Sequence, residues 1–124
     1  MSSETLDKLI RVRRVRARLA LAALGRTQAR QLGEAGLLAR VRLLLDNGGA
    51  RPGEMSAGAL KARAASDAML RQLAEDVSRR LGGTGAEKAR LGEALGRARA
   101  AVDAAVARRA ERETTPGQAK DTQR

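Results

Sequence analysis

The sequence contains no cysteine, no histidine and no aromatic residue among its 124 positions. Without these side chains it cannot provide a Cys or His nucleophile, a Cys/His zinc site, a disulfide, or aromatic rings that stack on bases. The longest uninterrupted apolar run, at positions 19–24, has six residues, whereas a membrane-spanning helix needs about 20 and a signal peptide about 7 to 15. These absences exclude most small enzymes and a transmembrane segment, and we expect a cytoplasmic protein.

Large apolar residues are also scarce, because Leu, Ile and Val together number 24 and the net charge is +11. This composition lies near the boundary at which disorder becomes the default. However, Ala occurs 26 times, Arg 21 times and Leu 17 times, and all three are strong helix formers. The composition therefore predicts helices that pack along a thin apolar seam, without a thick globular core.

The first predicted helix spans about residues 4–46. This segment has no proline, and Glu4 and Asp7 stand near its start, where the helix dipole favours anions. Asn47-Gly48-Gly49 follows, and Asn and Gly tolerate the left-handed conformation at a helix C-terminus. We therefore expect the helix to end here and a turn to occupy residues 47–54.

The second predicted helix spans about residues 55–113 and precedes a polar tail, residues 114–124, that we expect to be disordered. Alternating steps of three and four residues along this helix select fourteen positions, of which ten are apolar. A seven-residue repeat of this length is typical of a coiled coil. The predicted fold is thus all-α, a long antiparallel two-helix coiled-coil hairpin over residues 1–113. The predicted seam consists of Leu60, Arg63, Asp67, Leu70, Ala74, Val77, Leu81, Thr84, Lys88, Leu91, Leu95, Ala98, Val102 and Ala105.

The glycine-rich segment Gly82-Gly83-Thr84-Gly85 interrupts the second helix. Thr84 and Glu87 have the spacing of a capping box, so a new helix could start at Thr84. Because the seven-residue repeat continues across this segment, a kink or a short break is favoured over a third helix that folds back. Its backbone N–H groups could hold an anion, but the chain has no Gly-Lys pair and hence no P-loop.

No other pattern predicts a catalytic residue, a metal site or a cofactor. Asp46-Asn47-Gly48-Gly49 lacks the later oxygen ligands of a calcium loop. The acidic pair Glu75-Asp76 points in different directions on a helix and has no His or Cys beside it. We therefore expect a protein that is not an enzyme.

A hairpin that turns near residue 50 pairs positions whose numbers sum to about 101. This register places Leu6 near Leu95, and the second helix then projects past the start of the first. The projecting part carries Val102 and Val106, which would have no partner within the chain. We expect something else to cover them.

The sharpest charge asymmetry is the stretch from Lys8 to Gly33, which holds eight basic residues and no acidic one. On a helix this stretch presents two apolar stripes, with Arg11, Arg14 and Arg18 on one border and Arg13 and Arg16 on the other. The three alternatives are a solvated Arg-rich surface, a face that binds an acidic protein, and phosphate contacts to nucleic acid or lipid. The first stripe is Leu6, Ile10, Ala17, Leu21 and Leu24, and the second is Val12, Val15, Leu19 and Ala22.

The opening Leu6-Asp7-Lys8-Leu9-Ile10-Arg11-Val12-Arg13-Arg14, followed by a long helix, a turn and a second heptad helix, resembles the FliJ-like family of flagellar and type III secretion export proteins. The resemblance implies a stalk seated in the hexameric export ATPase, which promotes ring assembly, couples the ring to the export gate and in some members escorts chaperones. It also implies a cytoplasmic protein beside the membrane export apparatus. By position, the partner-binding end would comprise Leu6, Leu9, Ile10, Arg11, Val12, Arg13, Arg14, Ala98, Val102 and Val106.

The alternative function is that of a nonspecific basic nucleic-acid-binding protein. The net charge favours it, but the chain has no aromatic residue and no recognition motif. Residues 1–46 hold +6 of the total charge of +11. A protein that coats DNA would more often distribute its basic residues along its whole length.

Overall fold

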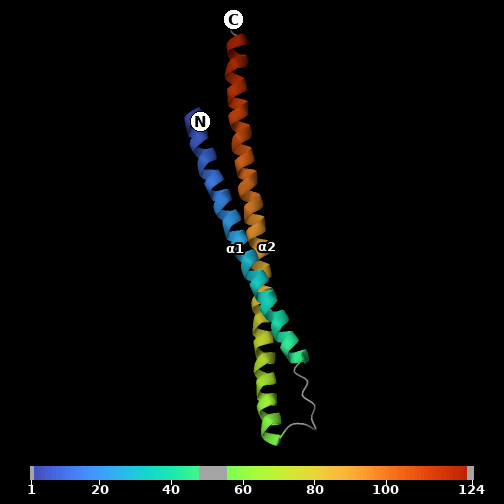
Figure 1. The fold of residues 1–124 in the computed structure, drawn as a ribbon. Helices are drawn as coiled ribbons and strands as arrows, with labels where there is room; N and C mark the ends of the chain where they lie inside the picture. The colour runs from blue at the N-terminus through green and yellow to red at the C-terminus, as the bar shows by residue number, and fades with distance from the viewer. Residues whose placement is uncertain (1, 48–55, 123–124) are drawn as a thin grey trace. The chain divides into compact units, whose positions relative to one another are not determined.

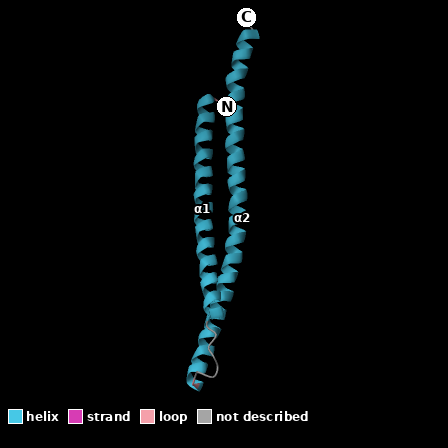
Figure 2. Cartoon of the chain, turned by 45° about the vertical axis from the view of Figure 1, so that its right-hand side comes forward, coloured by secondary structure: helices cyan, strands magenta, loops and turns pink. Residues whose placement is uncertain are grey.

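The computed structural model describes the backbone of residues 2–47 and 56–122, and side chains as far as Thr114. The described residues form two helices, α1 (Ser3–Asn47) and α2 (Ala57–Thr122), and they contain no strand (Figures 1 and 2). The first predicted helix and its end are confirmed within one residue. The predicted turn at residues 47–54 lies outside the described residues from residue 48 onward.

Each helix begins at a serine cap. Ser2 Oγ accepts a hydrogen bond from the Thr5 backbone N–H at 3.1 Å, and Ser56 Oγ accepts one from the Ala59 backbone N–H at 3.1 Å. A serine at this position satisfies one of the backbone donors that have no partner in the first turn of a helix. Ser56 therefore places the start of α2 slightly later than the sequence pattern predicted.

The C-terminal end of α2 differs from the prediction. The helix was expected to stop at Glu113, but α2 continues to Thr122. Thr114 stays within it and donates its hydroxyl to the carbonyl oxygens of Ala110 and Glu111, each at 3.0 Å. Residues 114–122 are therefore helical although they include Pro116 and Gly117, the two residue types that are least favoured inside a helix.

The expected break at Gly82-Gly83 is wrong, because α2 passes through both glycines as one helix and no described glycine has a positive φ. Thr84 does not cap a new helix. Its hydroxyl instead lies 2.8 Å from the Arg80 carbonyl oxygen, four residues earlier in the same helix. Gly82 and Gly83 are exposed and have open space around them, so they weaken the helix without redirecting it.

The described residues divide into two units. Unit 1 combines Met1–Arg26 with Ala89–Arg124, and unit 2 is Thr27–Lys88. In each unit a segment of α1 packs antiparallel against a segment of α2, which confirms the all-α helical hairpin. Unit 1 is joined by Asp7 with Arg109 and by Arg13 with the Ala101 carbonyl. Unit 2 is joined by Arg30 with Glu87 and by Glu34 with Thr84.

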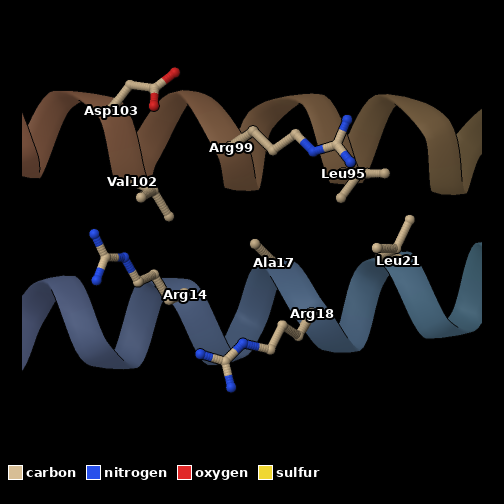
Figure 3. A pocket seen from close by; sticks show the side chains of 8 residues that line it. All are labelled: Arg14, Ala17, Arg18, Leu21, Leu95, Arg99, Val102 and Asp103. Atoms are coloured by element: carbon tan, nitrogen blue, oxygen red, sulfur yellow. The ribbon is translucent and has the colours of Figure 1, made fainter.

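The predicted register between the helices is wrong. For each of the four pairs that join the helices, the residue number on α1 and that on α2 add up to about 116, whereas the prediction required about 101. Leu6 therefore does not lie near Leu95. Leu95 instead faces Leu21 (Figure 3). The prediction assumed that α2 begins at the level at which α1 ends. Residues 48–56 separate the helices, a length close to the predicted turn, but α2 begins beyond the level of Asn47 (Figure 1). Side-chain packing between the helices, and not the length of the connection, therefore sets the register.

The seam between the helices follows a seven-residue repeat on both sides. The seam predicted for α2 is confirmed from Arg63 to Ala105, since every predicted position in that range is buried or half-buried, whereas Leu60 is exposed. Several seam positions of α1 are polar, so a search for regularly spaced apolar residues does not identify them. The buried and half-buried positions of α1 at this spacing are Leu6, Ile10, Arg13, Ala17, Ala20, Leu24, Thr27, Gln31, Glu34, Leu38, Val41 and Leu45.

Candidate protein-binding surfaces of unit 1

Part of the predicted partner-binding end is occupied by the seam. Leu6 and Ile10 are only 3% and 4% exposed, and Ala98 and Val102 are half-buried in the seam of α2. With the observed register, Val102 faces α1 and is not part of an unpartnered overhang (Figure 3). These four side chains stabilise the hairpin and present little surface to a partner.

Arg13 also belongs to the seam. It is half-buried, and its Nη1 donates a hydrogen bond to the Ala101 carbonyl oxygen at 2.8 Å. The guanidinium lies in a shallow groove that runs along one flank of the seam. Arg16 and Arg97 line the same groove. Arg13 therefore joins α1 to α2, and its charge is not free to steer a partner as the sequence pattern suggested.

The outer face of α1 in unit 1 exposes large apolar side chains. We define the outer face as Lys8, Arg11, Val12, Val15, Arg16 and Leu19. Val12, Val15 and Leu19 are 48%, 47% and 64% exposed, and the helical repeat places them opposite the seam. This is the second apolar stripe of the sequence analysis, and no described residue covers it.

Basic residues surround this apolar stripe. Lys8, Arg11 and Arg16 line a shallow groove together with Val12 and Val15, and no acidic residue takes part. Lys8 lies 3.8 Å from Glu4, but both side chains are largely exposed, so that pair contributes little. Within the described residues Arg11 and Arg16 have no ion pair, so both are available to an acidic partner.

A second groove lies between the helices on the flank opposite Arg13 (Figure 3). Apolar side chains from both helices form its floor, and charged side chains from both helices stand at its rim. Its volume is about 370 Å³. The floor consists of Ala17, Leu21, Leu95 and Val102, and the rim of Arg14, Arg18, Arg99 and Asp103. This groove was not predicted from the sequence, because the assumed register did not bring Leu21 and Leu95 together.

The remaining predicted residues lie beside these surfaces. Arg14 is exposed at the rim of the interhelical groove, Leu9 is half-buried next to the seam, and Val106 is 40% exposed on α2. Of the predicted end, Arg11, Val12, Arg14 and Val106 are therefore accessible to a partner.

Basic charge is concentrated in unit 1. Its segments hold fifteen Lys and Arg against seven Asp and Glu, whereas unit 2 holds ten against seven. A local excess of one sign raises the rate at which oppositely charged partners are encountered. Unit 1 is consequently the part of the chain that favours an acidic partner.

The described residues offer no grouping typical of a metal or catalytic centre. Among them, no cluster of three Asp, Glu, His or Cys side chains is placed to hold a metal ion. Asp76 of the acidic pair accepts a hydrogen bond from Gln72 at 3.1 Å and pairs with Arg79. In the described part of the chain, no helix has the length and hydropathy required to cross a bilayer.

Comparison with known proteins gives no match: no family model, no curated protein and no solved structure is significantly similar to this chain.

Proposed function

We propose that the chain is a non-catalytic coiled-coil adaptor that binds an acidic protein through the outer face of α1, and that this protein is the hexameric ATPase of a flagellar or type III export apparatus. In this role unit 1 is the stalk end that enters the ring, promotes its assembly and couples it to the export gate. The protein would act in the cytoplasm, beside the membrane export apparatus.

The observation that carries the proposal is the exposed stripe Val12, Val15 and Leu19 between basic side chains. A coiled-coil hairpin needs one apolar stripe for each helix, and α1 already buries its seam. The stripe Val12, Val15 and Leu19 is a second apolar stripe on the same helical turns of α1, and its apolar area stays in water unless a partner covers it. The arginines beside it supply charge complementarity, which fixes orientation and speeds association.

The choice of an export ATPase rests on the resemblance of residues 6–14 to the FliJ-like opening and on the helical hairpin that follows it. Arg11 and Val12 of this opening are exposed on the outer face. They are therefore accessible to the inner surface of a ring. The other element of the resemblance, the two-helix stalk, is consistent with the hairpin in both units.

The test measures ATP hydrolysis and hexamer formation by the export ATPase of the same organism, with and without this protein. We expect the wild-type protein to increase both. The double variant Arg11→Glu and Arg16→Glu should abolish the increase, because both charges line the groove of the outer face and neither forms an ion pair or a hydrogen bond that joins the two described helices. Circular dichroism should show an unchanged helix content.

The matched control is Arg40→Glu and Arg42→Glu, which makes the same change of charge on exposed residues of the same helix in unit 2. This variant should stimulate the ATPase as the wild type does. Equal loss in both double variants would show that net charge alone matters, and no effect of the wild-type protein on the ATPase would refute the stalk.

The excess of basic residues in unit 1 also supports binding to nucleic acid as a second candidate. In that case affinity for arbitrary duplexes should fall by roughly 10³ or more between 50 and 200 mM salt if six or more phosphates are contacted. Leu19→Ser separates the two functions. It removes apolar area from the outer face without changing the charge, so it should weaken a protein partner and leave duplex binding unchanged.

A further inference from the structure

We propose that the interhelical groove of unit 1 binds an acidic amphipathic helix of a partner protein, which packs against α1 and α2 as a third helix. The groove is distinct from the outer face. The proposal therefore goes beyond the adaptor function and holds whether or not the outer face binds a ring ATPase.

The floor of the groove is apolar and consists of side chains from both helices. Leu21 from α1 and Leu95 from α2 face each other across it, and Ala17 and Val102 continue the floor along the helices (Figure 3). Leu95 is only 6% exposed, whereas Leu21 is 49% exposed. The part of Leu21 that α2 does not cover is thus the apolar surface that an added helix would bury.

The two flanks of the seam differ at this level. On one flank the Arg13 guanidinium lies across the seam and is bonded to the Ala101 carbonyl at 2.8 Å, with Arg16 and Arg97 beside it. That flank also has a groove, but its apolar lining is limited to Ala98 and Ala101, and the Arg13 guanidinium in it is already hydrogen-bonded. On the other flank no described side chain lies over Leu21, and the charged groups stand only at the rim. An added helix therefore fits the flank of Leu21.

The rim charges select the chemistry of the occupant. The rim holds three arginines, Arg14, Arg18 and Arg99, and one carboxylate, that of Asp103, so the rim has an excess of positive charge. Glu or Asp beside the apolar stripe of the partner helix would pair with the arginines. A second copy of this chain fits poorly, because each copy has a net charge of +11 and association would bring like charges together.

The extent of the groove sets the length of helix that it contacts. The lining residues span 14–21 on α1 and 95–103 on α2, which is about two helical turns or roughly 11 Å. A partner helix would present apolar side chains at positions i, i+4 and i+7 toward the floor. Because an interface of two turns is small, we expect electrostatic attraction to account for much of the affinity at low salt.

The test uses the full chain and a fluorescent synthetic helix of about five turns, with leucines along one stripe and glutamates on both sides of it. A second peptide has the same composition in scrambled order, so its charge is equal but it has no apolar stripe. Fluorescence anisotropy measures both affinities. We expect the first peptide to bind at least about tenfold more tightly than the scrambled one.

The chain offers a matched pair of variants for locating the site. Leu21→Ser and Leu19→Ser remove the same exposed side chain from the same helix, but Leu21 lies in the groove and Leu19 on the outer face. Leu21→Ser should weaken peptide binding about tenfold, as should Arg99→Glu, while Leu19→Ser should change it less than about twofold. Leu19→Ser should instead reduce the effect on the ATPase, so the two proposals fail separately.

Methyl NMR spectra of the full chain place the peptide directly. Resonances of Leu21, Leu95 and Val102 should shift on titration, and those of Val12 and Val15 should not. The proposal would be overturned if the scrambled peptide bound as tightly as the amphipathic one, or if Leu19→Ser weakened peptide binding as much as Leu21→Ser. It would also be overturned if vesicles of anionic lipid bound the chain through Leu21 and the peptide did not bind.

Discussion

Val77 contributes to stability through burial, since it is 1% exposed in the seam of unit 2. Val77→Asp places a charge among apolar neighbours without a partner, so we expect the free energy of unfolding to fall by about 3 kcal/mol or more. Met69, on the same helix, is 75% exposed, and Met69→Asp should change stability by less than about 0.5 kcal/mol. Urea unfolding monitored by circular dichroism gives both values. Equal effects would mean that the seam does not run through Val77.

Thr84 and Glu34 form a polar contact within the seam of unit 2. Thr84 is 6% exposed, and its hydroxyl lies 2.8 Å from Glu34 Oε2. Thr84→Val removes the hydroxyl and leaves the half-buried carboxylate without this donor, which should cost about 1 to 3 kcal/mol. Adding Glu34→Leu should recover most of that loss, because two apolar side chains then replace two polar ones.

The variants Thr84→Val and Glu34→Leu, together with the double variant, form a double-mutant cycle. The cycle measures the coupling free energy between the two residues. We expect the loss in Thr84→Val to exceed the loss in the double variant, as measured by urea unfolding. Simple additivity of the two single variants would show that the Thr84 hydroxyl contributes through the Arg80 carbonyl and not through Glu34. The contact across the seam would then not contribute to stability.

At the scale of the helix, Gly82 and Gly83 test the continuity of α2. A Cβ atom added at either position meets nothing within 4 Å. Because alanine is favoured over glycine by up to about 1 kcal/mol per helical residue, Gly82→Ala and Gly83→Ala should each raise the thermal midpoint. A lower midpoint in both variants would indicate that these glycines form a turn or hinge in solution.

The seam of α2 was predictable from sequence, whereas that of α1 was predictable only in part. In α2, Leu and Val recur at the seven-residue spacing and outweigh the polar positions. In α1 the repeat passes through Arg13, Thr27 and Glu34, which an apolar pattern treats as interruptions. The predicted stripe on α1 therefore included Leu21, which lies on the flank of the seam and is 49% exposed.

The register between the helices could not be read from either helix alone. A seven-residue repeat is satisfied equally well when one helix slides by seven residues, and nothing in the sequence fixes how far the connection extends. The exposed stripe Val12, Val15 and Leu19 agrees with the second apolar stripe predicted from the sequence, because its position depends only on the geometry of α1. Of these three residues, the predicted partner-binding end included only Val12. The interhelical groove depends on the register, and for that reason it was missed.

At the scale of the whole chain, charge is the dominant feature. Arg13, Arg16 and Arg97 line one groove, and the ion pairs Arg109 with Asp7 and Arg30 with Glu87 are partly exposed, so each contributes little. Repulsion among 25 basic side chains opposed by 14 acidic ones should therefore outweigh these attractions at low ionic strength.

Added salt should therefore stabilise the hairpin. Raising sodium chloride from about 10 to 150 mM shortens the screening length from about 30 to 8 Å, which weakens repulsion between arginines more than it weakens contacts within the seam. We expect the thermal midpoint to rise over this range, and to rise less in Arg16→Gln, which removes one of the three clustered charges. Circular dichroism melts at constant pH provide the measurement, with Arg40→Gln as the control in unit 2. A midpoint that falls with salt would show instead that the ion pairs stabilise the hairpin by more than the repulsion destabilises it.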